Sequence, residues 1–164
     1  MVPANVTIAC VEAELAGAEA WLVRHVVSHK FDRESLVFEA VMTHPATGKA
    51  LRLVGDMNGY KAVPPAWTFV DHDTNEPRQS AWPKGEPLPE NAGSSIFILH
   101  RKQSVVCAPF NRLAYKDANG VHANWGNSSG WLQLQGPKHV KATTIGEMLA
   151  VIDLHLLQSK ECMK

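Results

Sequence analysis

The chain has no excess of either charge, no paired cysteines and no long apolar run, and each absence excludes a class of protein. Lysine and arginine together number 16, as do aspartate and glutamate, so the formal net charge is zero. Without a basic surplus the sequence offers no electrostatic footprint for nucleic acid or an anionic membrane. We therefore expect partners that are proteins or small molecules, with no nucleic-acid or membrane partner.

Cysteine is scarce, and its three positions, Cys10, Cys107 and Cys162, form no Cys-x-x-Cys pair. An odd number at such spacings does not suit a disulfide scaffold and favours a reducing compartment. No apolar run reaches about 18 residues, so no membrane span is expected. The N-terminus lacks the basic and apolar regions of a signal peptide, and we expect a cytoplasmic protein. At 164 residues, the chain is expected to form a single domain over residues 1–164.

Hydropathy patterns predict the first half of the fold. Apolar residues recur at steps of three and four over residues 8–26, which indicates an amphipathic helix. Residues 35–43 and 49–56 have strand-like composition, and the loop between them is typical of a hairpin. Another short strand is expected at residues 67–70. These elements predict an antiparallel meander with a helix packed on one face.

The second half is less regular. Residues 71–95 are polar and proline-rich, which predicts a long surface loop, and residues 116–136 form a second irregular region. Thr144 and Glu147 have the spacing of a capping box, and an apolar stripe over residues 145–156 predicts a helix after it. We therefore expect an α+β fold with an N-terminal helix, a four-stranded antiparallel meander and a C-terminal helix.

A tyrosine and proline motif stands between the predicted strands. Proline lacks a backbone N–H and fixes φ, so Pro64-Pro65 must mark a rigid turn rather than a central strand. With Tyr60 and Phe69 the prolines form the pattern Tyr-x3-Pro-Pro-x3-Phe. This resembles the Tyr-Pro-x-x-Pro-Pro-x-x-x-Phe signature of ubiquitin-conjugating (E2) enzymes, with Lys61 in place of the first proline. We assign the motif residues to architecture rather than to chemistry.

The resemblance to E2 enzymes implies a UBC-like fold and a function. The order of elements matches that family over most of the chain, and Cys107 is the only cysteine where the family places its nucleophile. The resemblance therefore implies a carrier that accepts a ubiquitin-like protein from an E1-like enzyme as a Cys107 thioester. An amine on a target protein would then attack the thioester, and no cofactor is needed. The chain looks more like divergent bacterial E2-like proteins, some of which are linked to antiviral defence.

The sequence also departs from the family pattern. Where E2 enzymes carry a His-Pro-Asn triplet, this chain has His100-Arg101-Lys102, so the residue that stabilises the oxyanion is open. His100 is one candidate, because it could donate a hydrogen bond to the developing oxyanion. His122 and Asn124 are rivals, on a loop that follows Cys107 and could fold over it. Asn111 is expected to serve turn chemistry.

Two other functions remain open. Cys107 could be a buried structural cysteine, in which case the chain would be a non-catalytic E2 variant or an RWD-like protein-binding module. The eight histidines suggest a metal-dependent hydrolase as the other function. His25 and His29 have the spacing of a zinc-binding helix but lack its glutamate. The spacings of His100, Cys107, His122 and His139 match no compact set of zinc ligands. We therefore expect no metal site.

Two tryptophans lie in the glycine-rich region after Cys107. We expect Trp131 to pack on the core and Trp125 to line a groove.

Overall fold

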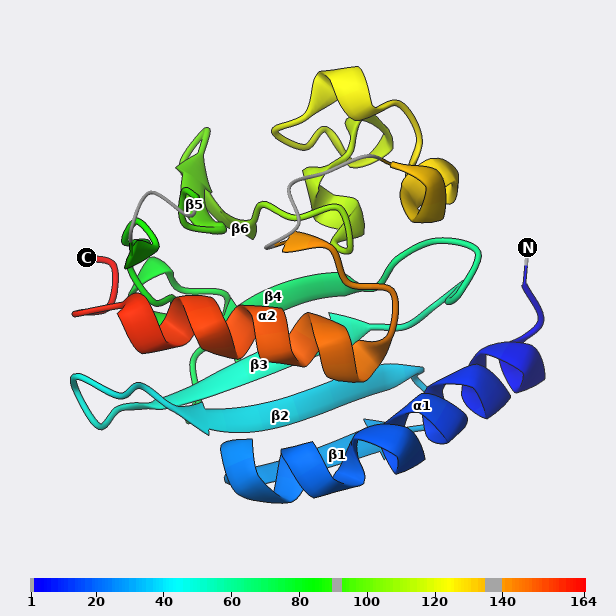
Figure 1. Ribbon diagram of the computed structural model, residues 1–164, viewed down its shortest axis with the longest axis horizontal. Coiled ribbons are helices and arrows are strands. Elements are labelled where there is room, and N and C mark those ends of the chain that lie inside the picture. Colours follow the sequence, from blue (N-terminus) through cyan, green and yellow to red (C-terminus); the bar gives the residue numbers. More distant parts are fainter. Residues whose placement is uncertain (1, 90–92, 135–139) are drawn as a thin grey trace.

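The computed structural model describes residues 2–89, 93–134 and 140–164. Figure 1 shows two helices in front of a sheet, with the segment after β6 extending away from it. The elements are α1 (Ala4–His25), β1 (Ser28–Asp32), β2 (Val37–Thr43), β3 (Ala50–Asp56), β4 (Ala66–Val70), β5 (Phe97–His100), β6 (Gln103–Val106) and α2 (Ile145–Gln158).

The main sheet has four antiparallel strands in the order β1-β2-β3-β4. Its inward face follows from the alternation of the two central strands, because every second residue of β2 and β3 is buried. Helices α1 and α2 contact each other and bury apolar residues in the same core as the sheet. The predicted arrangement of N-terminal helix, four-stranded antiparallel sheet and C-terminal helix is confirmed.

Two features of the second half differ from the prediction or extend it. The proline-rich segment is not wholly a surface loop, because Ala81, Trp82 and Leu88 are buried. Trp82 packs edge-on against Phe69 of β4, with ring centroids 5.3 Å apart. The apolar runs around residues 96–106 form a two-stranded antiparallel hairpin, β5-β6, that ends directly before Cys107.

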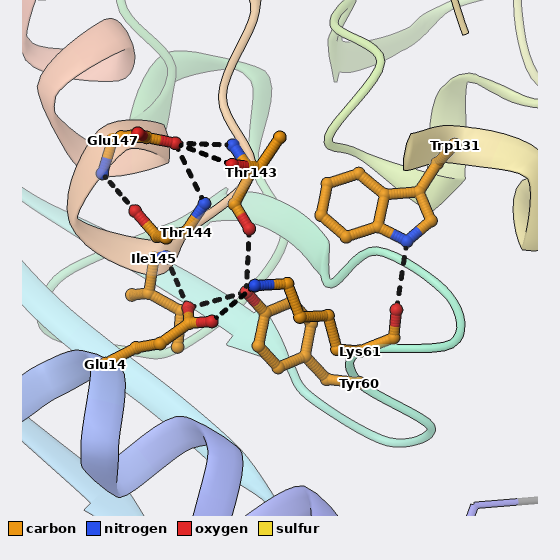
Figure 2. A network of polar contacts seen from close by, with 8 residues as sticks. All are labelled: Glu14, Tyr60, Lys61, Trp131, Thr143, Thr144, Ile145 and Glu147. Atoms are coloured by element: carbon orange, nitrogen blue, oxygen red, sulfur yellow. Dashed lines mark hydrogen bonds and ion pairs between the residues drawn. The ribbon is translucent and has the colours of Figure 1, made fainter. Parts of the chain in front are cut away.

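The proline turn is tied to both helices through Glu14 of α1 (Figure 2). Tyr60 is fully buried, and its hydroxyl donates to Oε2 of Glu14 at 2.6 Å. The same oxygen accepts the backbone N–H of Ile145 at 2.8 Å, at the start of α2. Lys61, which replaces the first proline of the motif, pairs its Nζ with Oε1 of Glu14 at 2.8 Å. Glu14 therefore joins α1, the turn and α2.

The start of α2 is fixed by the predicted capping box. The Thr144 hydroxyl accepts the N–H of Glu147, whose carboxylate accepts the N–H of Thr144 (Figure 2). Trp131 lies on the opposite side of the turn, where its Nε1 donates to the carbonyl of Lys61 at 3.1 Å. Trp131 is 3% exposed, as expected for a core residue.

Candidate active site around Cys107

Cys107 directly follows strand β6, at the start of a loop. Its backbone N–H still donates to the carbonyl of Ile96 at 2.7 Å, which extends the β5-β6 ladder by one residue. Pro109 follows two positions later and cannot continue that ladder. Cys107 is half-buried, between the core and the surface.

Asn111 fixes the segment that follows Cys107. It is fully buried, and its Oδ1 accepts the N–H of Trp67 in β4 at 2.9 Å. Its Nδ2 donates to the carbonyl of Val106 at 2.8 Å, at the end of β6. The side chain also caps a 3-10 turn by accepting the N–H of Leu113 at 3.3 Å. Asn111 therefore does more than the expected turn chemistry: it ties the cysteine-bearing strand to the main sheet.

The loop that carries His122 folds back onto Cys107. The N–H of His122 donates to the carbonyl of Ala114 at 2.9 Å, and a parallel bridge pairs Tyr115 with His122. This return places Nε2 of His122 2.9 Å from Sγ of Cys107. Of the predicted site residues, these are the two that the structure brings together.

A cavity of about 350 Å³ opens beside the thiol. Its wall includes Cys107 itself, with Ser95, Pro109 and Val140. The rings of His122 and Trp125 complete it, so Trp125 lines a hollow as expected. Cys107 therefore borders a cavity with room for a small chemical group.

Burial shifts both members of the pair toward their uncharged forms. Burial raises the pKa of the Cys107 thiol above its ordinary value. Burial also lowers the pKa of His122, and the charge of His100 adds to that shift. Because a neutral imidazole can accept at Nε2, a thiol that donates its proton to this nitrogen satisfies both groups. The resting pair is therefore a thiol beside an unprotonated base.

His100 and Asn124 lie elsewhere. His100 pairs with Gln103 at the far end of the β5-β6 hairpin, three residue pairs from the Phe97–Val106 pair. At a rise of roughly 3.3 Å per residue, its backbone lies about 10 Å from the end of β6. Asn124 is exposed in a 3-10 turn. The structure does not bring either residue to the sulfur of Cys107.

His100 instead faces a smaller cavity of about 90 Å³, whose wall includes Gly120 and Val121. Its Nε2 is buried without a hydrogen-bond partner among the described residues.

The histidines suggested for a metal are dispersed. His25 ends α1 and pairs with Asp153 at 3.0 Å, whereas His29 lies in β1, so the two histidines do not share one helix. Within residues 2–89, 93–134 and 140–164, no three His, Cys, Asp or Glu side chains converge as metal ligands would. His139 lies outside the described residues.

Sequence reasoning missed the support beneath His122. The hydroxyl of Tyr115 donates to the carbonyl of Pro109 at 2.7 Å, which joins the His122 loop to the Cys107 segment. Its ring meets Trp125 edge-on, with centroids 5.2 Å apart. The one available signal was Trp125 in the glycine-rich region, and nothing local shows which groups it faces.

In the part of the chain that the structure describes, neither helix has the length and hydropathy needed to cross a bilayer. Comparison with protein-family models, curated protein sequences and solved structures finds no match to this chain.

Proposed function

We propose that this chain is an E2-like carrier with a UBC-like fold. Cys107 accepts the C-terminal carbonyl of a ubiquitin-like protein from an E1-like enzyme and passes it to an amine on a target protein. One observation carries the catalytic part: Nε2 of His122 lies 2.9 Å from Sγ of Cys107, beside an open cavity. The partners are inferred from the resemblance of residues 60–69 to the E2 signature. The same resemblance suggests a cytoplasmic, bacterial antiviral conjugation system.

The dyad suits thioester exchange. As Sγ attacks the carbonyl of the incoming thioester, Nε2 of His122 takes the thiol proton. The tetrahedral intermediate then collapses, the thiolate of the E1-like enzyme leaves, and the imidazolium returns the proton to it. In the second step, the unprotonated His122 takes a proton from the attacking amine, the amide bond forms as the Cys107 thiolate leaves, and the imidazolium returns the proton to that sulfur. Because the thioester is already activated, positioning and proton transfer are the main contributions required.

The neutral resting state limits the reactivity of Cys107 in the absence of a substrate. A buried thiol with a raised pKa is a poor nucleophile on its own, since the thiolate is the reactive form. Cys107 therefore reacts efficiently near neutral pH only when His122 accepts its proton as it attacks an electrophile in the cavity.

A second candidate is a non-catalytic E2 variant or RWD-like module that binds a partner protein. The burial of Cys107, with its raised pKa, favours this reading, as does the replacement of the His-Pro-Asn triplet by His100-Arg101-Lys102. In that case Cys107 fills space at the end of β6, and its replacement by serine leaves partner binding intact.

A charging assay separates the two candidates. The chain is incubated with ATP and with a bacterial E1-like enzyme and its ubiquitin-like protein, and products are resolved on a non-reducing gel. We expect a thiol-sensitive adduct that is absent in Cys107→Ala. Cys162→Ala, which removes another half-buried cysteine, should charge as the wild type does.

Replacing the base tests the dyad itself. We expect His122→Asn to slow charging by at least about tenfold, because general-base assistance is lost. Failure of the wild type to form an adduct with a competent E1-like enzyme would favour the binding module. Adduct formation in Cys107→Ala would place the acceptor elsewhere.

A further inference from the structure

Among the residues that the structure describes, the imidazole of His122 has no second hydrogen-bonding partner of the kind that usually orients a catalytic histidine. In thiol and serine dyads, the base is commonly held by a third polar group on its other nitrogen. In the described part of the chain, the only hydrogen bond of the His122 ring is the one with Cys107. The other contact of the ring in this part of the chain is aromatic.

An aromatic stack constrains the ring. The ring of His122 lies parallel to the indole of Trp125, with centroids 3.7 Å apart and planes 10° apart. The ring of Tyr115 meets the indole of Trp125 edge-on, with centroids 5.2 Å apart and an interplanar angle of 62°. A ring in close face-to-face contact cannot turn about its χ2 bond without losing that contact, so the stack limits the direction in which Nε2 points.

The stack is also anchored to the segment that carries the thiol. Tyr115 donates its hydroxyl to the carbonyl of Pro109, two residues after Cys107. The N–H of Trp125 donates to the carbonyl of His122 at 3.0 Å, which closes a tight turn between the stacked residues. Beyond this turn, Asp117 accepts the hydroxyl of Ser128 at 2.8 Å, so the loop is fastened on both sides.

We propose that Trp125 is a positioning residue for the dyad: its indole, braced by Tyr115, holds Nε2 of His122 against the thiol of Cys107. The role rests on the proposed function only in that His122 assists Cys107. Trp125 makes no hydrogen bond with the sulfur and acts through the orientation of the imidazole.

The test measures alkylation of Cys107 by iodoacetamide across pH in the full chain, read by mass spectrometry of the peptide that contains it. The wild-type profile should have two limbs. The lower limb, at pH about 6 to 8, depends on His122 as base, and the upper limb, above pH about 9, reports unassisted thiolate. His122→Asn gives the reference profile without the lower limb.

We expect Trp125→Leu to lower the rate on the lower limb by about tenfold, toward that of His122→Asn, and to leave the upper limb unchanged. Trp125→Phe, which retains an aromatic face, should recover most of the lower limb. The matched control is Trp21→Leu: Trp21 stacks on His25 with centroids 4.4 Å apart and an interplanar angle of 1°, at the end of α1. Removal of that stack should leave both limbs as in the wild type.

The outcomes separate this proposal from the proposed function. A lower limb that persists in Trp125→Leu would overturn the positioning role and leave the His122 base in place. Loss of the lower limb in Trp21→Leu as well would also overturn it, since a general loss of stability would then explain both. A wild-type profile with no lower limb would remove the role of His122, and with it the ground for Trp125, while charging of Cys107 is decided independently on the non-reducing gel.

Discussion

A single carboxylate, Glu14, links three parts of the chain that lie far apart in the sequence. It accepts hydrogen bonds from Tyr60 and the N–H of Ile145, and it pairs with Lys61 (Figure 2). Its side chain is only 15% exposed, so these contacts are poorly replaced by water. Glu14 holds the proline turn against both helices.

Glu14→Gln should therefore lower the free energy of unfolding by about 1–3 kcal/mol, because an amide cannot pair with Lys61 and also accept from both donors. Urea denaturation followed by circular dichroism measures the change. The matched control is Glu12→Gln on the same helix, whose salt bridge with Arg33 is more exposed. That change should cost less than about 1 kcal/mol, and equal losses in the two variants would contradict the role assigned to Glu14.

At this scale the sequence predicted residue types better than partners. Tyr60 and Phe69 are buried, as their assignment to architecture requires. The Lys61–Glu14 pair was not predicted, since its members are 47 positions apart and no periodic pattern joins them. The same reason applies to the candidate site: the loop of His122 was expected to be able to reach Cys107, but only the folded loop distinguishes His122 from His100.

Elements with a strong local signal were predicted, and those without one were not. Helix α2 carries both a capping box and an apolar stripe, and it forms where both indicate. Strand β1 was not predicted: it has no fully buried residue, so no apolar alternation marks it in the sequence. Its place in the sheet comes from pairing with β2 over Ser28–Val41 to Asp32–Val37, which is a tertiary effect.

The β2-β3 hairpin is joined to the C-terminal segment through a buried histidine. His44 is fully buried, and its Nε2 lies 3.0 Å from the hydroxyl of Ser159, just after α2. Its Nδ1 accepts the N–H groups of Ala46 and Thr47, both at 3.3 Å. Burial lowers the pKa of His44, because the charged imidazolium is poorly solvated there.

Stability should therefore depend on pH through this contact. A lowered pKa in the folded state means that the unfolded chain binds more protons below pH about 6.5, so stability is complete above that value and falls as the pH decreases. His44→Gln should reduce the loss of melting temperature between pH about 7 and about 5. The residual slope includes His122, whose pKa is also lowered by burial. The control is His29→Gln, at a half-buried histidine 3.7 Å from an exposed carboxylate; the same flattening in both variants would contradict the assignment.

On the scale of the whole molecule, the segment between β4 and β5 joins the core to the C-terminus. Trp82 belongs to the same buried cluster as the sheet and α2. Next to it, Pro83 forms a bridge with Cys162, and the N–H of Lys84 donates to the carbonyl of Glu161 at 2.8 Å. Composition alone indicated a polar surface loop, because one tryptophan among prolines and charges gives no periodic signal.

This arrangement predicts what removal of the segment does. Trp82→Ala should cost about 3–5 kcal/mol of stability, as expected for loss of a buried tryptophan. Deletion of residues 74–90 should lower the melting temperature at least as much, because it removes the contacts with Cys162 and Glu161 as well. Arg78→Ala, which removes an exposed pair with Glu76 in the same segment, should leave the melting temperature unchanged.

If the deletion variant melted like the wild type and lost only charging, the segment would be a docking element for the E1-like enzyme. An equal loss of folding in Trp82→Ala and the deletion would instead make it part of the core that holds β4, β5 and the C-terminus together.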